Sequence, residues 1–63
     1  MVFRLHIHCD NAVFADDPNA EVARILEEQV IPVVRSDPFV DNWAKALRDM
    51  NGNSVGFAAF YDD

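Results

Sequence analysis

The sequence predicts a small α+β domain: an antiparallel sheet of two or three strands with one kinked or broken helix pair packed on one face, in the order β-α-α-β-β. Three observations predict it: an alternating segment at the N-terminus, helical spacing of apolar residues behind two Asp-Pro pairs, and an Asn-Gly pair before a second alternating segment. With 63 residues the chain is too short for a TIM barrel or a two-domain enzyme, and 51% apolar residues is too many for a disordered acidic tail. We expect residues 1–63 to form a single domain.

The first segment, residues 2–9, alternates as a half-buried strand does. The two faces would carry Phe3, Leu5, Ile7 and Cys9 on one side and Arg4, His6 and His8 on the other. Because Cys9 falls on the apolar face, we expect it to be a buried structural thiol. A single cysteine cannot form an intramolecular disulfide, which is typical of proteins in a reducing cytoplasm.

A helix is expected to begin at Asp17-Pro18, since Asp caps helix N-termini and Pro suits the first helical position. Apolar residues then recur at helical spacing, and charged ones occupy the opposite face. The apolar set is Val22, Ile25, Leu26, Val30, Val33 and Val34; the charged set is Glu21, Arg24, Glu27 and Glu28. Pro32 removes one backbone hydrogen bond, so we expect a kink or an end near Ile31.

The next segment repeats the Asp-Pro signal at Ser36-Asp37-Pro38, which predicts a second, shorter helix. Its apolar positions would be Phe39, Val40, Trp43, Ala44 and Leu47. Residues 46–50 fit two structures, either the last turn of that helix or a strand that enters a hairpin. We favour the hairpin, because Asn51-Gly52 is typical of tight type I′ turns.

The last segment, Ser54 to Tyr61, predicts a strand with Val55, Phe57, Ala59 and Tyr61 on one face. Gly56 would thin the other face or mark a bulge. A sheet this small leaves edges that could pair with another strand, so a homodimer is an alternative to a monomer.

Two groups of side chains contain residue types that occur in metal sites. His6, His8 and Asp10 are residue types that zinc or iron accept, but two histidines on a polar strand face are more simply explained as exposed side chains.

Residues 49–53 match the first three oxygen ligands of a calcium loop. The sixth position, however, is Ser54 where that loop needs Gly, and the twelfth is Phe60 where it needs Glu. No phosphate-binding loop is present either. We expect no metal, no cofactor and no enzymatic activity.

Acidity is the remaining signal, since 11 Asp and Glu against 5 Lys and Arg leave a formal charge of −6. This charge argues against direct binding to nucleic acid or to an anionic membrane, and it suits docking on a basic protein surface. The candidate partner-binding residues are Asp16, Asp17, Glu21, Glu27, Glu28, Asp37 and Asp41. The alternative is that these residues only keep the chain soluble and support the helix, where Arg24 can pair with Glu21 and Glu28.

Four stretches together resemble small phage and prophage proteins of unassigned function. They are Cys9-Asp10-Asn11-Ala12-Val13-Phe14, Asp17-Pro18, Glu21-Val22-Ala23-Arg24-Ile25-Leu26 and Leu47-Arg48-Asp49-Met50-Asn51-Gly52-Asn53-Ser54-Val55-Gly56, which are 24 of the 63 residues. The chain departs from that pattern at Val13, where the family has Ala, and over residues 30–41, where two prolines interrupt the expected helix. The resemblance implies an origin in a mobile element and favours the hairpin; it implies no activity and no functional residue. Together with the single cysteine, this origin predicts a place in the cytoplasm of a bacterial host.

Together these observations favour a non-enzymatic inhibitor of a host nucleic-acid-binding complex, in its concrete form an anti-CRISPR protein that mimics DNA. Its carboxylates would occupy an Arg and Lys groove that otherwise holds phosphates. A second hypothesis is a self-associating accessory or structural protein that pairs through a sheet edge or through Phe39, Trp43 and Phe60. A metal-dependent enzyme that uses His6, His8 and Asp10 is the least favoured hypothesis.

Overall fold

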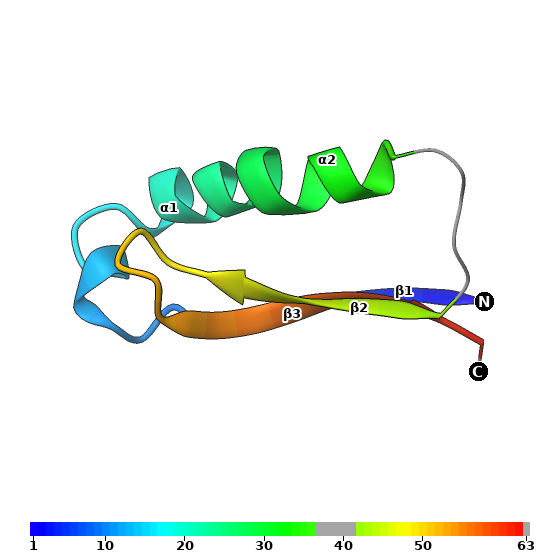
Figure 1. Ribbon diagram of the computed structural model, residues 1–63. Coiled ribbons are helices and arrows are strands. Elements are labelled where there is room, and N and C mark those ends of the chain that lie inside the picture. Colours follow the sequence, from blue (N-terminus) through cyan, green and yellow to red (C-terminus); the bar gives the residue numbers. More distant parts are fainter. Residues whose placement is uncertain (37–41, 63) are drawn as a thin grey trace.

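The computed structural model describes residues 1–36 and 42–62 and has two layers, a three-stranded antiparallel sheet and one helical layer (Figure 1). The elements are β1 (Val2–Ile7), the 3-10 turn η1 (Ala12–Phe14), α1 (Pro18–Ile25), the π-helical segment η2 (Leu26–Val30), α2 (Ile31–Val34), β2 (Trp43–Arg48) and β3 (Ser54–Tyr61). The strand order is β1-β3-β2, so β3 lies between the two others. The predicted α+β class, with helix on one face of a small antiparallel sheet, is confirmed.

The helical layer is a single kinked helix of 17 residues that begins at Pro18. Its N-cap is Asp17, whose side chain accepts a hydrogen bond from the Ala20 amide, as the Asp-Pro signal predicted. The helix continues past Ile31 to Val34 and includes Pro32, which follows directly after the π-helical segment Leu26–Val30 and the residue Ile31. Pro32 has no amide hydrogen to donate to the preceding turn, and both prolines and π-helical turns are sites at which helices kink. The predicted interruption is therefore a kink and not an end.

The prediction of a second helix is wrong for Trp43, Ala44 and Leu47, which lie in β2. Asp37, Pro38, Phe39, Val40 and Asp41 lie outside the described residues. Trp43 and Leu47 are four residues apart, a spacing that places two side chains on one face of a helix and equally on one face of a strand. Burial along β2 alternates with period two, and pairing with β3 decides for the strand.

The hairpin between β2 and β3 is confirmed, but its turn is not of type I′. A type I′ turn needs positive φ at both central residues. Here Gly52 has φ 85°, whereas the φ of Asn51 is not positive. The turn closes with hydrogen bonds from the Gly52 amide to the Asp49 carbonyl (3.0 Å) and from the Asp49 amide to the Asn53 carbonyl (2.9 Å). This is the longer loop in which glycine takes the left-handed position.

β3 contains a bulge beside Gly56, one of the two alternatives that the sequence leaves open for this glycine. Leu47 pairs with Gly56 and Arg48 with Ser54, so Val55 is the extra residue and turns into the core. Gly56 also permits a close approach of β1. A Cβ atom at this position would overlap the backbone carbonyl of His6.

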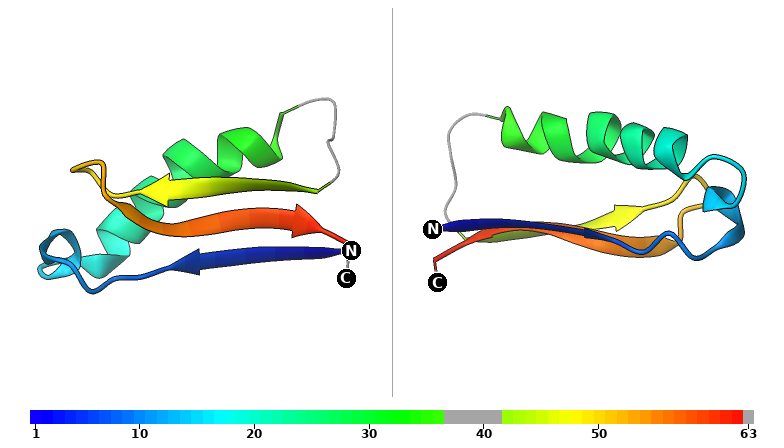
Figure 2. Two further views of the ribbon diagram at one scale, coloured as in Figure 1. Left: turned by 60° about the horizontal axis from the view of Figure 1, so that its bottom comes forward. Right: turned by 180° about the vertical axis from the view of Figure 1, so that it is seen from behind.

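The core lies between the helix and the sheet and consists of six buried residues: Phe14, Ile25, Val30, Leu47, Val55 and Ala58. Seen from the side of the sheet, the helix runs obliquely across it and leaves the N-terminal part of β1 uncovered (Figure 2). Phe3 and Leu5, which share a face with Ile7 on the helix side, are for this reason 40% and 41% exposed. Phe3 instead packs against the rings of Phe60 (5.0 Å between centroids) and Trp43 (6.2 Å).

Candidate protein-binding surface

The N-terminal end of the helix presents two of the predicted acidic residues to solvent. Asp16 and Asp17 are both exposed. Asp17 is held in place by its capping bond to the Ala20 amide (3.1 Å), which still leaves its second carboxylate oxygen to solvent. Negative charge at this end of a helix also suits the helix dipole. These two carboxylates can therefore contact a partner without loss of the helix start.

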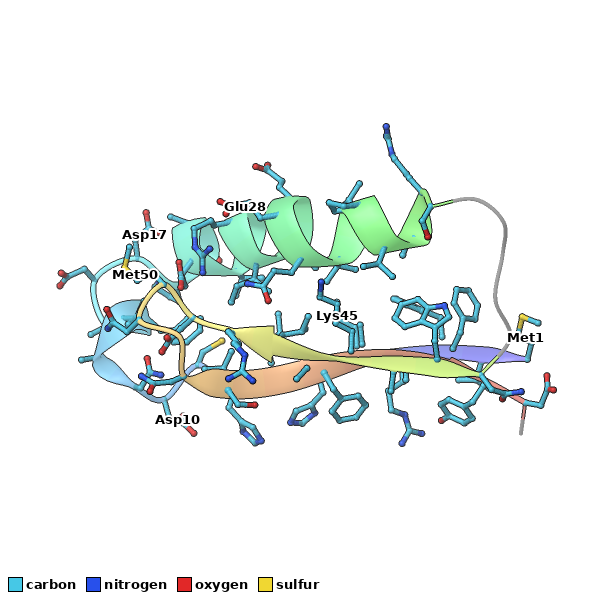
Figure 3. The ribbon with its side chains drawn as sticks, in the orientation of Figure 1. Met1, Asp10, Asp17, Glu28, Lys45 and Met50 are labelled. Carbon is cyan, nitrogen blue, oxygen red and sulfur yellow. The ribbon has the colours of Figure 1, made fainter. Side chains whose placement is uncertain are left out.

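Glu27 and Glu28 lie further along the helix, in the π-helical segment, and are exposed as well. The Glu28 side chain is 62% exposed and accepts a long hydrogen bond (3.4 Å) from Arg24. Figure 3 shows Asp17 and Glu28 on the helical layer, with Asp10 on the opposite side of the molecule beyond the end of β1. We call Asp16, Asp17, Glu27 and Glu28 the acidic helix surface.

Glu21 does not belong to this surface, although the sequence placed it there. Its side chain is only 6% exposed. Its two carboxylate oxygens accept hydrogen bonds from Arg24 (2.8 and 3.0 Å), and one also accepts from the Met50 amide (2.9 Å). The bond from Arg24, more than any other contact, lowers the pKa of Glu21. Glu21 joins the helix to the hairpin turn and is not available to a partner.

Asp49 is a second buried carboxylate, and the sequence did not reveal its role. It is 4% exposed and accepts four hydrogen bonds, from Asn11 Nδ2 (2.7 Å), the Asn51 amide (2.9 Å), the Asn53 amide (2.9 Å) and Asn53 Nδ2 (3.3 Å). Burial acts to raise the pKa of Asp49, but these hydrogen bonds together outweigh it and lower the pKa. The residues that resembled calcium ligands thus bind one another and the backbone.

The helix is also tied to the edge strand β2 through Gln29. The Gln29 side chain accepts a hydrogen bond from the Arg48 amide (2.9 Å) and donates one to the Arg48 carbonyl (2.7 Å). Arg24 makes a weaker contact with the same carbonyl (3.4 Å). This pairing mimics a neighbouring strand, and it blocks the end of β2 beside the turn. Nothing in the spacing of Gln29 distinguishes it from a solvent-exposed glutamine.

The end of β1 differs from the prediction in one respect. Cys9 is exposed and not buried, because the strand ends at Ile7 and the chain leaves the sheet before Cys9. His6 and His8 lie on the side away from the helix, as predicted, and their Nε2 atoms are 3.0 Å apart. Within residues 1–36 and 42–62, no three His, Cys, Asp or Glu side chains come together as a metal site would require.

Asp37 and Asp41, the other two predicted partner-binding residues, lie outside the described part of the chain. Among the described helices, none has the length and apolar character needed to cross a membrane. Comparison of the chain with protein-family models, with curated proteins and with solved structures found no match.

Proposed function

We propose that this chain is a non-enzymatic protein-binding module whose acidic helix surface docks on a basic surface of a nucleic-acid-binding complex and inhibits it. The observation that carries the proposal is the exposure of Glu27 and Glu28 on the helix and of Asp16 and Asp17 directly before its first residue. Of these four carboxylates, only Glu28 is ion-paired within the described residues. A carboxylate without an internal ion pair can bind an Arg or Lys side chain of a partner without first breaking such a pair.

The charge density on the helix limits how closely this surface imitates DNA. Asp17 and Glu28 are separated by 11 residues, or about 16 Å along the helix axis. Over that length a DNA duplex carries about ten phosphate charges. The four carboxylates of the acidic helix surface supply less than half of that number, and Arg24 offsets one of them. The surface therefore suits part of a basic groove, and the concrete form we propose is partial occupation of the DNA groove of a CRISPR complex in a bacterial host.

A charge-reversal experiment tests the proposal. The double variant Glu27→Lys/Glu28→Lys should lose capture of a basic nucleic-acid-binding complex from nuclease-treated lysate of a CRISPR-bearing host, and the wild-type capture should weaken with rising salt. The matched control is Asp10→Lys/Asp62→Lys, which changes the net charge by the same amount at two exposed positions off the helix. Equal capture by the two double variants would refute a role for the helix, because net charge alone would then explain the binding.

A self-associating accessory protein is the second candidate, and the sheet supports it. β1 and β2 are both edge strands, and β1 contains neither Lys nor Pro, two residues that protect edges against pairing. This candidate predicts a mass in light scattering that rises with protein concentration and does not depend on Glu27 and Glu28.

A further inference from the structure

The helix covers one face of the sheet, and no element in the described part of the chain covers the other (Figure 1). The strand register gives the residues of this open face in three rows. The β1 row is Val2, Arg4 and His6, the β3 row is Phe57, Ala59 and Tyr61, and the β2 row is Ala44 and Ala46. His8 continues the β1 row, since its ring meets that of His6.

The central row of the open face carries the aromatic rings. Phe57 is 38% exposed, and Tyr61 lies four residues further along the same strand. The ring of Phe57 is stacked on that of His6, with 5.8 Å between centroids and 13° between planes. The guanidinium of Arg4 lies 5.8 Å above the ring of Tyr61. Each aromatic ring thus contacts a guanidinium or imidazole group of β1.

The two outer rows differ in a way that gives the face a direction. The β2 side of the rings has the small exposed side chains of Ala44 and Ala46 beside Phe57. Arg48, which continues this row at the turn, donates a hydrogen bond to the Gly52 carbonyl (3.2 Å). The β1 side has Arg4, His6 and His8, all exposed. A ligand with flat rings on one side and negative charge on the other matches this order.

The charge of the chain is divided between the two layers. The eight Asp and Glu among residues 1–36 and 42–62 all lie outside the three strands, whereas Arg4, Lys45 and Arg48 lie within them. Lys45 points toward the helix in Figure 3, so it does not contribute to the open face. Asp10 and Asp62 lie beyond the ends of β1 and β3 and bound the face at its two ends. The acidic side chains of the described residues, which contribute to the formal charge of −6, therefore do not lie on the open sheet face.

From this arrangement we infer that the open sheet face binds single-stranded nucleic acid, with bases stacked on Phe57 and Tyr61 and phosphates along Arg4, His6 and His8. Aromatic side chains on an exposed antiparallel sheet are a common platform for unpaired bases. The two rings are about 13 Å apart along β3, enough for two or three nucleotides. A second copy of the chain fits the face less well, because the three rows contain no carboxylate that could pair with Arg4 of the other copy. Acidic residues elsewhere on the chain repel phosphates, so the binding is weak and sensitive to salt.

The test uses the whole chain and fluorescein-labelled single strands of about twelve nucleotides, oligo-dT in one arm and oligo-rU in the other, with anisotropy read at about 20 mM salt. Phe57→Leu, which keeps an apolar side chain but removes the ring, should weaken binding by roughly tenfold or more, while Phe57→Tyr should retain it. The matched control is Ile31→Ala, at a similarly exposed apolar residue (42%) on the helix. Circular dichroism confirms that each variant is folded.

Two results would overturn the inference. One is equal affinity of the wild type and Phe57→Leu, or no binding of either strand by the wild type. The other is a Phe57-dependent rise of molecular mass in light scattering without any oligonucleotide, which would assign the face to a second copy. The outcome is separable from that of the proposed function: Glu27→Lys/Glu28→Lys should leave oligonucleotide binding intact or strengthen it, and Phe57→Leu should leave capture of the basic complex intact.

Discussion

Gly56→Ala measures how closely β1 must approach β3. The added Cβ would overlap the His6 carbonyl and lie 2.7 Å from the carbonyl carbon of His6 and 2.9 Å from Ile7 Cα. All three are backbone atoms, so no side-chain rotation relieves the overlap. β1 has to move away, which strains the pairing of Ile7 with Gly56 and the hydrogen bond from the His8 amide to the Val55 carbonyl (2.7 Å).

The expected cost follows from these contacts. Overpacking costs about 1–3 kcal/mol, and each of two weakened hydrogen bonds adds about 0.5–1.5 kcal/mol, so the free energy of unfolding should fall by about 2–6 kcal/mol. A domain of this length has a total stability of about 3–9 kcal/mol. The midpoint of thermal unfolding should therefore drop by at least about 10 °C, which circular dichroism or calorimetry can follow.

Gly52→Ala is the matched control. Gly52 has φ 85°, but no atom lies within 4 Å of the position its Cβ would take. The change should cost only about 1 kcal/mol, from the left-handed conformation. If Gly56→Ala destabilises the chain no more than Gly52→Ala does, the close approach of β1 to β3 at Gly56 is not tight and the reasoning fails.

Two further predictions concern the contacts between helix and hairpin. Folding lowers the pKa of Glu21 from its ordinary value of 4.5 and that of Asp49 from 3.8. Both ionised carboxylates therefore stabilise the fold above these ordinary values, and this stabilisation is lost as the pH falls through the lower pKa of each group in the folded state. The urea concentration at the unfolding midpoint should fall steeply below about pH 4 in the wild type and less steeply in the double variant Glu21→Gln/Asp49→Asn. At pH 7 the double variant should be the less stable protein. Parallel pH profiles of the two proteins would contradict this prediction. Gln29→Ala should cost about 1–2 kcal/mol, because the Arg48 amide loses its partner and the Arg48 carbonyl keeps only the long contact with Arg24 (3.4 Å). Hydrogen exchange of the Arg48 amide should then accelerate, and unchanged protection would show that the strand end does not depend on Gln29.

The contrast between Glu21 and Glu28 shows what spacing along a helix can and cannot say. Both fall on the charged stripe, and the sequence treats them alike. Only Glu21 meets the hairpin turn, where the Met50 amide and Arg24 bind it. Residue 50 is far from residue 21 along the chain, so no local pattern contains that contact. Glu28, seven residues further along the helix, accepts only the long hydrogen bond from Arg24 (3.4 Å).

The sequence by itself determined the elements whose causes are local. The Asp17 cap, the alternation of β1 and the glycine turn at residues 49–53 follow from the side chains at those positions. Pairing decided what local patterns left ambiguous: Trp43 and Leu47 belong to a strand because β3 lies beside them, and Cys9 is exposed because β1 ends before it. The open sheet face with Arg4, Phe57 and Tyr61 also arises only in three dimensions, since side chains that alternate along each strand are collected onto one face when the strands align.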